Sequence, residues 1–479
     1  MSVPWVEIAG VVINVAGWLH AAHALMRART AEGTIAWVMC LIVLPFIAIP
    51  LYWVLGRSRF RGYVLARRAK DGPLATTFLE VLQTLAACEH HEDPPHPLLR
   101  PSAKLSGLPV TTGNDLELLA EGGQAFERMF EDIGKAKFYV LVLFFIVKSD
   151  DVGQRFKEAL IERAKAGVRV FLLFDEFGSR KLPESYIESL IEAGVRPIAF
   201  STQLGKGNRF QINFRNHRKI IVIDGHVAFS GGMNIGDEYT GVHTELGVWR
   251  DTLVRIEGPA VQCMQLVFVE DWNWATGAPP EDLIWEPPDL ARCKAGRGAR
   301  TLVLPTSPAD ALDSCHLFFL EAIAAARRRI WITSPYFVPD RAIVAALQAA
   351  AVRGVDVRIL LPNDPDHLLV YLSSFSFLHE MDLAGVGVYR YENGFLHQKV
   401  MLIDQELASV GTANFDNRSF RLNFEIITLV QDQAFASEVE AMLDDDFSHS
   451  RQVTAREYTQ KPVWFRIGVR LARLMTPIQ

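Results

Sequence analysis

Residues 217–224 read HRKIIVID and residues 397–404 read HQKVMLID, so the pattern HxKxxxxD occurs twice, 180 positions apart. The same spacing separates three further identical pairs, namely Gly231 and Gly411, Asn234 and Asn414, and Glu245 and Glu425. Because one register holds across the whole stretch, we interpret it as an internal duplication whose unit of about 180 residues is a domain rather than a solenoid repeat.

Each copy predicts a strand with its polar residues at one end. In the first copy, His217 and Lys219 are two residues apart and therefore lie on one face of a strand. The apolar run that follows continues this strand into a core, and Asp224 closes it at a turn. The next strand returns Asn234 to the same end. Each half is thus expected to present an imidazole, an ammonium and a carboxamide on one surface.

Apolar runs alternate with helical stretches in both halves. The runs are residues 137–146 and 168–174 in the first half, and residues 329–333 and 355–361 in the second. Continuous apolar strands that alternate with helices are typical of an α/β fold whose sheet is covered on both faces. We expect two duplicated halves that pair about a pseudo-two-fold axis into one catalytic unit.

Proline-rich polar segments and the repeat suggest domain boundaries. The expected units are an N-terminal membrane segment, a linker, a first half, a second linker, a second half and a cationic amphipathic C-terminal helix. Their ranges are residues 1–70, 71–105, 106–275, 276–300, 301–460 and 461–479.

The N-terminus contains two apolar stretches. Residues 34–55 carry no charge over 22 positions, which is enough to cross a bilayer. Residues 8–26 are a weaker candidate because they include Asn14, His20 and His23. Together they predict a transmembrane helical hairpin. Residues 57–70 hold six basic residues and no acidic one, so the positive-inside rule predicts a multi-pass membrane protein with its body in the cytoplasm.

The charge is unevenly distributed. The net charge is -6, of which residues 1–70 contribute +6 and the remaining chain -12. An acidic body argues against binding of a nucleic-acid backbone. Five cysteines without a CxxC pair predict reduced thiols. Cys88 lies near three histidines (His90, His91 and His96). Because this segment is polar and rich in proline, we expect a solvated linker there rather than a metal site.

The doubled constellation suits a phosphodiester. Lys219 and Lys399 can neutralise the non-bridging oxygens, and the amides of Asn234 and Asn414 can donate to them. One histidine can attack phosphorus while the other protonates the leaving alkoxide. No metal or cofactor is expected, since the lysines and an imidazolium supply the positive charge.

The acidic residues have supporting roles. Glu245 and Glu425 are expected to accept a hydrogen bond from the second ring nitrogen of each histidine and so fix its tautomer. Asp224 and Asp404 belong to the catalytic motifs, although a structural role at the strand turn is favoured for both. The residues alone are symmetric and do not choose between His217 and His397 as the nucleophile.

These residues carry a resemblance to a known family. The doubled HxKxxxxD with its glycines and asparagines resembles the phospholipase D superfamily. Residues 216–239 (NHRKIIVIDGHVAFSGGMNIGDEY), 249–252 (WRDT), 334–340 (SPYFVPD) and 411–425 (GTANFDNRSFRLNFE) are similar to its bacterial cardiolipin synthase branch. The resemblance implies that two phosphatidylglycerols give cardiolipin and glycerol. It further implies a phosphatidyl-histidine on His217, with His397 as acid and then base, and phosphatidylglycerol and anionic membrane lipid as partners.

Three alternatives remain open from the sequence. A hydrolytic phospholipase D would resolve the same intermediate with water. A nuclease of the superfamily is opposed by the apolar N-terminus and the acidic body, and an inactive membrane scaffold is opposed by two intact motifs. Nothing in the sequence identifies a protein partner.

Overall fold

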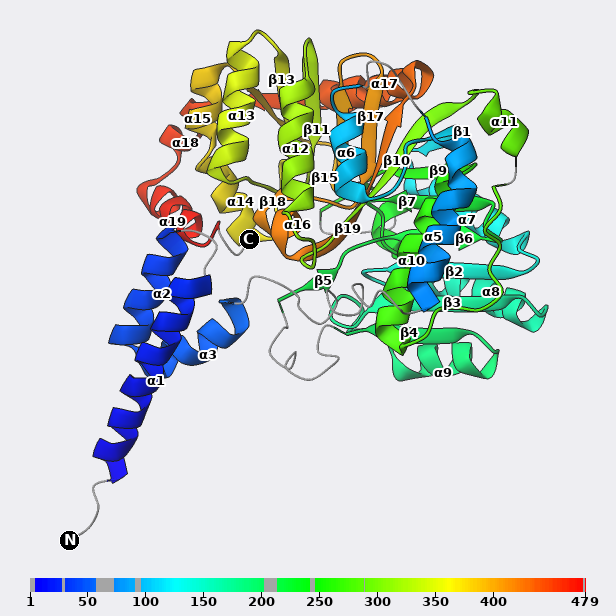
Figure 1. The fold of residues 1–479 in the computed structure, drawn as a ribbon. Coiled ribbons are helices and arrows are strands. Elements are labelled where there is room, and N and C mark those ends of the chain that lie inside the picture. The colour runs from blue at the N-terminus through cyan, green and yellow to red at the C-terminus, as the bar shows by residue number, and fades with distance from the viewer. Residues whose placement is uncertain are drawn as a thin grey trace.

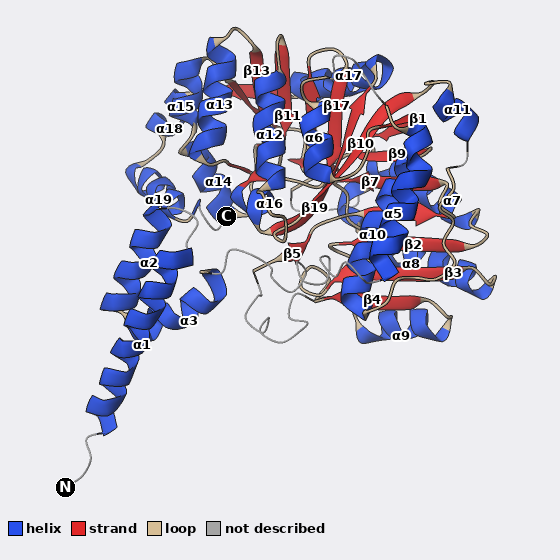
Figure 2. Cartoon of the chain, in the orientation of Figure 1, coloured by secondary structure: helices blue, strands red, loops and turns tan. Residues whose placement is uncertain are grey.

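The computed structural model describes residues 5–27, 31–56, 73–90, 96–201, 213–241, 246–287, 289–476 and 479. It has a mixed α/β fold in which two similar halves share one sheet, and the N-terminal helices project from one side of this body (Figures 1 and 2).

The sheet has the same strand order in each half, counted outward from the junction where β1 and β10 pair antiparallel. In the first half the order is β1 (Thr111–Leu119), β9 (Leu253–Glu257), β7 (Val227–Gly231), β6 (Ile220–Ile223), β2 (Tyr139–Phe144), β3 (Arg169–Asp175) and β4 (Arg196–Phe200). In the second half it is β10 (Ala299–Thr306), β19 (Asn423–Gln431), β17 (Leu407–Gly411), β16 (Val400–Ile403), β11 (Arg329–Thr333), β13 (Asp356–Pro362) and β14 (Gly387–Tyr391), with β20 (Ser450–Val453) at the edge. The matching order confirms the duplication and the buried strands that the apolar runs predict.

Helices cover the sheet (Figure 2). Those of the first half are α7 (Gly122–Gly134), α8 (Asp151–Lys165), α9 (Glu184–Glu192) and α10 (Ala260–Thr276). Those of the second half are α12 (Ser314–Ala325), α13 (Arg341–Val352), α14 (Leu368–Phe375), α15 (Leu378–Ala384), α16 (Asn417–Arg421), α17 (Gln433–Ser448), α18 (Ala455–Gln460) and α19 (Val463–Leu474). Helix α10 is buried on nearly every side, as expected of a core helix. It follows β9 as α17 follows β19, which extends the duplication to the helices.

Two short strand pairs join one half to the other. Strand β5 (Arg215–Asn216) pairs in parallel with the start of β19, and β15 (Phe395–Leu396) pairs in parallel with β8 (Trp249–Arg250). In each pair one strand immediately precedes a motif histidine. A third short pair, β12 (Phe337–Val338) with β18 (Phe415–Asp416), lies within the second half.

The N-terminal helices differ from a simple hairpin. Helix α1 (Trp5–Arg27) has 23 residues, and within it Glu7–Arg27 is long and apolar enough to cross a membrane. The second apolar stretch, predicted as one span, is divided into α2 (Ala31–Val43) and α3 (Pro45–Leu55), and α3 diverges from α1 (Figure 1). Pro45 has no N–H to continue the ladder, so the helix restarts there. At 13 and 11 residues, neither piece alone crosses about 30 Å of hydrocarbon.

Polar residues of α1 are satisfied within this helical group. His23 Nδ1 lies 2.8 Å from the Tyr52 hydroxyl, and Trp53 Nε1 donates to His20 Nε2 at 2.8 Å. A Cβ on Gly17 would lie 2.4 Å from the carbonyl oxygen of Leu41, so glycine permits the close approach of α1 to the helix break.

The segments expected to be linkers contain regular elements. They include α5 (Pro73–Leu85), the 3₁₀ turn η1 (Ala86–Cys88), α6 (Leu99–Ser106) and α11 (Leu290–Lys294). A disulfide joins Cys88 to Cys293, with Cα atoms 4.7 Å apart. The expectation of reduced thiols is therefore wrong for this pair, whose 205-residue separation hides it from a reading of local spacing.

Candidate active site

Both motif histidines stand where one half of the molecule contacts the other. The backbone N–H of His217 donates to the carbonyl of Phe424 at 2.9 Å, continuing the β5–β19 pair. The backbone N–H of His397 donates to the carbonyl of Arg250 at 2.7 Å, continuing the β15–β8 pair. Each histidine is thus held in position by the opposite half.

Each imidazole also receives its carboxylate from the opposite half. His217 Nδ1 lies 2.9 Å from Glu425 Oε2, and His397 Nδ1 lies 2.6 Å from Asp251 Oδ2. Both carboxylates are buried. A carboxylate at Nδ1 keeps the proton on that nitrogen and leaves Nε2 for chemistry.

The sheet register makes Asp251 the counterpart of Glu425. Gly231 pairs with Leu253, two residues after Asp251, and Gly411 pairs with Ile427, two residues after Glu425. The expected role of Glu425 agrees with this geometry. Glu245, the other residue expected to orient a histidine, lies outside the described residues, and it is Asp251 that contacts Nδ1 of His397. The available signal was the WRDT string, which contains Asp251.

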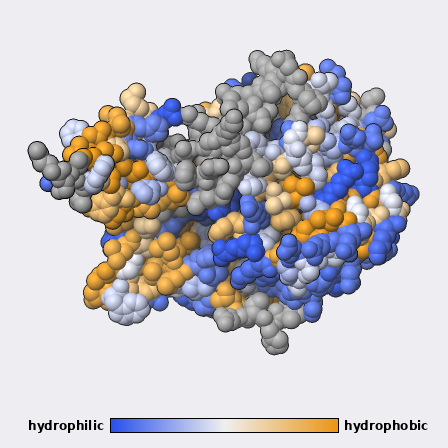
Figure 3. Space-filling view, turned by 90° about the horizontal axis from the view of Figure 1, so that it is seen from below, coloured by the Kyte–Doolittle hydropathy of each residue, from blue (hydrophilic) through white to orange (hydrophobic). Residues whose placement is uncertain are grey.

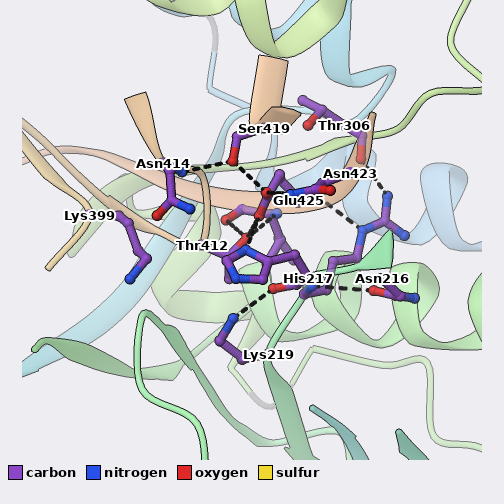
Figure 4. A network of polar contacts seen from close by, with 12 residues as sticks. Asn216, His217, Lys219, Thr306, Lys399, Thr412, Asn414, Ser419, Asn423 and Glu425 are labelled. Carbon is purple, nitrogen blue, oxygen red and sulfur yellow. Dashed lines mark hydrogen bonds and ion pairs between the residues drawn. The ribbon is translucent and has the colours of Figure 1, made fainter. Parts of the chain in front are cut away.

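The two carboxylates have different surroundings. Figure 4 shows Glu425 within a network in which it accepts hydrogen bonds from Thr412 Oγ1 at 2.6 Å, Ser419 Oγ at 2.8 Å and Asn423 Nδ2 at 3.1 Å. At the position equivalent to Thr412 the first half has Gly232, where a Cβ would lie 2.1 Å from Asp251 Oδ1. The glycine makes room for the shorter acid, while threonine anchors the longer one.

Lys219 and Lys399 lie within the same buried site. Their side chains point toward the same side of the His217 ring (Figure 4). Lys219 Nζ donates to the carbonyl of His217 at 2.9 Å, and Lys399 Nζ donates to the carbonyl of His397. Burial and the charge of Lys399 lower the pKa of Lys219 to about 7. Burial lowers the pKa of Lys399 to about 8, against the opposing charge of Asp251.

Burial also favours the neutral histidines. It lowers the pKa of His217 below its ordinary value, against the opposing charge of Glu425. Burial and the ammonium of Lys399 lower the pKa of His397 to about 3. Although burial alone would raise it, the interaction with the His217 ring, the charge of Lys219 and the hydrogen bond from Thr412 hold the pKa of Glu425 below the ordinary range. Without substrate, the site holds two neutral imidazoles oriented by two carboxylates.

The two motif asparagines are not equivalent. Asn234 Oδ1 accepts from the backbone N–H of Ile146 at 3.2 Å, and its Nδ2 donates to the Tyr239 hydroxyl at 3.3 Å. Asn414 Oδ1 is buried without a hydrogen-bond partner in the described part of the chain. The Asn414 amide lies near Lys399 in Figure 4 and is the better placed of the two to meet a ligand.

The motif aspartates bind backbone N–H groups at the strand turns, away from the lysines. The Asp224 carboxylate accepts from the backbone N–H groups of Lys137, Phe138 and Tyr139 at 2.7–2.8 Å. Asp404 does the same at the start of β11, and both residues have a positive φ of 52°. They stand at the far ends of β6 and β16 from the lysines, which agrees with the structural role favoured from the sequence and not with a place among the catalytic residues.

A buried ion pair beneath the site was not anticipated. Arg218, between His217 and Lys219, donates from Nη1 to both carboxylate oxygens of Asp271 on α10, at 2.8 and 2.9 Å. Its Nε donates to the Glu425 carbonyl and its Nη2 to the Thr306 carbonyl, both at 3.1 Å. The side chain thereby ties β6 to β19 and β10 of the other half. The HxK pattern does not predict that its middle residue, Arg218, makes such a contact.

This arrangement can perform nucleophilic substitution at phosphorus. It offers two oriented imidazoles, two ammonium groups for the non-bridging oxygens, and aromatic neighbours. The rings of Phe145 and Trp249 lie 5.0 Å from those of His217 and His397, respectively. Such a site can form and resolve a covalent phospho-histidine.

Comparisons with known proteins agree with this chemistry. A family model described as "Cardiolipin synthase, PLD-like domain" matches residues 129–272 and 319–447, and one described as "Phospholipase_D-nuclease N-terminal" matches residues 12–57. The chain is 45% identical over 473 residues to Cardiolipin synthase A of Pseudomonas putida (strain GB-1), covering 98% of this chain and 97% of that protein. It is 45% identical over 483 residues to Cardiolipin synthase A of Pseudomonas aeruginosa (strain LESB58), covering 100% and 97%.

A solved structure shares the fold. The crystal structure of phosphatidylserine synthase from Haemophilus influenzae Rd KW20 aligns with a TM-score of 0.62 and 16% identity, covering 79% of this chain and 99% of that one. Together with the family match over more than half of the chain and the full-length relatives, the duplicated site identifies the chain as a member of the bacterial cardiolipin synthase family of the phospholipase D superfamily.

Proposed function

We propose that the protein is a membrane-bound phosphatidyltransferase that converts two phosphatidylglycerols into cardiolipin and glycerol. The observation that carries the proposal is the reciprocal support of His217 by Glu425 and of His397 by Asp251 beside two buried lysines. The two halves would then act as one pseudo-two-fold catalytic unit. The full-length similarity to proteins named Cardiolipin synthase A supports this reaction over others of the superfamily.

In the first step, His217 Nε2 attacks the phosphorus of a phosphatidylglycerol. The Nε2–P bond forms, the bond to the glycerol oxygen breaks, and His397 gives that oxygen a proton. Lys219, Lys399 and the Asn414 amide stabilise the charge on the non-bridging oxygens. The phosphodiester anion opposes the effect of burial and raises the pKa of His397 enough for it to act as an acid.

In the second step, His397 accepts the proton of the terminal hydroxyl of a second phosphatidylglycerol. The resulting alkoxide attacks phosphorus, a new P–O bond forms, and His217 is released. Choosing His217 as the nucleophile follows the family resemblance. Glu425 is consistent with this choice, because the hydroxyl groups of Thr412 and Ser419 also donate to its carboxylate. These hydrogen bonds hold the carboxylate, and therefore the His217 imidazole, in one position.

Transfer requires the lipid alcohol to compete with water. His217 and His397 are only 8% and 6% exposed, and aromatic rings adjoin both. A site that excludes water protects the phosphatidyl-histidine from hydrolysis. This burial favours transfer over the hydrolytic phospholipase D reaction.

A product assay tests the proposal. Full-length protein in mixed micelles is supplied with phosphatidylglycerol labelled in both the glycerol headgroup and the acyl chains. Release of glycerol together with labelled cardiolipin is the expected result. Phosphatidic acid as the main product would establish hydrolysis instead, and cleavage of DNA without lipid turnover would establish a nuclease.

A matched histidine variant provides the control. His226 lies exposed in the turn after β6, away from the site. His226→Gln should retain the product pattern, whereas His217→Gln and His397→Gln should each abolish it. Equal loss in all three variants would point to misfolding rather than to chemistry.

Membrane anchorage is part of the proposed function. The apolar helix α1 would cross the bilayer, and α2 and α3, each too short alone, would together make the second crossing beside it, giving the multi-pass topology. Residues 57–70, which lie outside the described part of the chain, carry six basic residues that favour the cytoplasmic side for the body. In this division, residues 1–70 anchor the protein, while residues 106–275 and 301–460 each contribute one histidine and one lysine.

The side of the body can be tested through Cys88 and Cys293. Disulfides are rare in a reducing cytoplasm. The disulfide of the structure and a cytoplasmic body therefore give opposite expectations for alkylation in acid-quenched cells, where a reduced pair would favour the cytoplasmic side. A pair that is already oxidised in intact cells would contradict the cytoplasmic assignment. Protease access in spheroplasts and inverted vesicles provides an independent check.

A further inference from the structure

Helix α19 leaves an apolar row of side chains uncovered on the body. The α19 stripe consists of Val463, Trp464, Ile467, Leu471 and Leu474, all between 55% and 75% exposed. Spacings of three and four residues place them on one face of the helix. Exposed apolar rows of this kind mark sites of contact with a partner or a membrane.

The stripe does not attach the helix to the protein. Helix α19 packs on α14 through a different row, which includes Phe465, Val469 and Ala472. The Phe465 ring lies 5.1 Å from that of Phe375. Because a separate face is used for packing, the stripe is available for an outside contact.

A third row of α19 is basic. Arg473 donates to the Glu380 carboxylate at 2.7 Å and so belongs to the body. Arg470 is exposed and Arg466 partly exposed, and both flank the stripe. An apolar row beside arginines matches the interface of an anionic bilayer, where the apolar side chains enter the acyl boundary and the guanidinium groups meet phosphates.

The surroundings of α19 favour a bilayer over a protein partner. Figure 1 shows α19 on the side of the body from which the N-terminal helices project. In Figure 3 the apolar atoms on that side gather chiefly where the N-terminal helices project. Leu368 and Leu369, exposed on the neighbouring α14, add to this surface.

The position of α14 relates this surface to the active site. Strand β13 runs parallel to β11, whose last residue, Thr333, pairs with Val400 directly after Lys399. Helix α14 begins six residues after the end of β13 and therefore lies at the active-site end of the sheet. A bilayer in contact with the α19 stripe would therefore lie next to the active-site end of the body, where the diacyl lipid substrate must enter.

We propose that α19 lies in the surface of an anionic bilayer, with the α19 stripe inserted and Arg466 and Arg470 at the headgroups. This second attachment, independent of the N-terminal helices, turns the active-site end of the second half toward the lipid. The inference rests on the membrane anchorage proposed above. Its test needs no catalysis, so it can fail while the proposed reaction stands.

The test uses full-length protein in vesicles of phosphatidylcholine and phosphatidylglycerol. A polarity-sensitive fluorophore is attached at Ile467→Cys or Leu474→Cys, in a background of Cys40→Ser that removes the exposed native thiol. The matched control is Val352→Cys, an exposed apolar position at the opposite end of the second half. Both stripe positions should show blue-shifted emission and several-fold stronger quenching by spin-labelled lipid than the control.

Two results would overturn the inference. Stripe probes that remain as accessible to an aqueous quencher as the probe at position 352 would mean that the helix stays in water. A blue-shifted probe that spin-labelled lipid does not quench would mean that protein, such as a second copy of the chain, covers the stripe.

Discussion

The Nδ1 atom of His397, in the second half of the chain, lies 2.6 Å from the carboxylate of Asp251, in the first half. The reverse relationship holds between His217 and Glu425. Neither half therefore contains both a motif histidine and its carboxylate, and the candidate active site exists only where the halves meet. The continuous sheet that the halves share holds the two histidines in place relative to each other.

Replacing either carboxylate should impair catalysis without removing a substrate contact. Glu425→Gln and Asp251→Asn each remove the charge that fixes the imidazole tautomer. We expect kcat to fall by roughly 10²- to 10⁴-fold, as when a catalytic histidine loses its carboxylate. As a control, Glu440→Gln removes a carboxylate that pairs with Arg329 away from the site. This variant should lose little of its kcat. Full activity of Glu425→Gln would disprove the orienting role.

The activity should depend on pH through the lysines. A lysine is cationic below its pKa, so the ammonium groups of Lys219 and Lys399 are lost as the pH rises through about 7 and 8, respectively. The kcat/KM for phosphatidylglycerol should therefore decline over this range, while kcat should decline only at higher pH because bound phosphate favours the ammonium. The exposed Lys135, replaced by methionine, should leave the profile unchanged. A profile that is flat up to the ordinary lysine pKa of about 10.4 would contradict this account.

Asp224 should matter for stability rather than for chemistry. Asp224→Ala leaves three backbone N–H groups without their acceptor and puts alanine at a positive φ. We expect a loss of about 1–3 kcal/mol in the free energy of unfolding, seen as a lower thermal midpoint, with kcat retained at low temperature. Asp224→Asn keeps a hydrogen-bond acceptor and tolerates the positive φ, so this variant should lose less of the free energy of unfolding. A variant with a normal midpoint and no activity would return Asp224 to the catalytic group.

The Arg218–Asp271 pair should be among the most sensitive structural contacts. Arg218→Met leaves Asp271 as a buried charge without its guanidinium, at a cost of about 3–5 kcal/mol. The exposed pair of Arg155 with Glu127 provides a control, and Arg155→Met should cost less than about 1 kcal/mol. Thermal midpoints in the same detergent measure both. Equal shifts for the two variants would mean that the buried pair does not stabilise the contact between the halves.

The sequence predicts those features of the molecule that are local or repeated. The apolar runs locate β2, β3, β11 and β13, and the doubled motif brings together both histidines and both lysines. The 180-residue register does not relate the two acids, which lie beyond the asparagines, because Asp251 follows Gly231 by 20 residues whereas Glu425 follows Gly411 by 14. Only the strand pairing reveals that these two acids are equivalent.

The remaining differences arise from contacts between distant residues. The composition of residues 34–55 is compatible with one membrane-spanning helix. In the structure this helix breaks before Pro45, where Gly17 of α1 closely approaches Leu41 and Pro45. The disulfide joins two segments that neither motif nor spacing relates. The contacts of Arg218 with Asp271 depend on how α10 packs beneath the sheet, which the residue type alone does not specify.

The central claim is that His217, supported by the opposite half, carries the phosphatidyl group. The most direct measurement is mass spectrometry of peptides from full-length His397→Ala and His217→Ala proteins, quenched after prolonged exposure to labelled phosphatidylglycerol because formation of the adduct is slow without the acid His397. The account predicts a phosphatidyl adduct on His217 in the His397→Ala protein and no adduct in the His217→Ala protein. An adduct on His397 in the His217→Ala protein would contradict it.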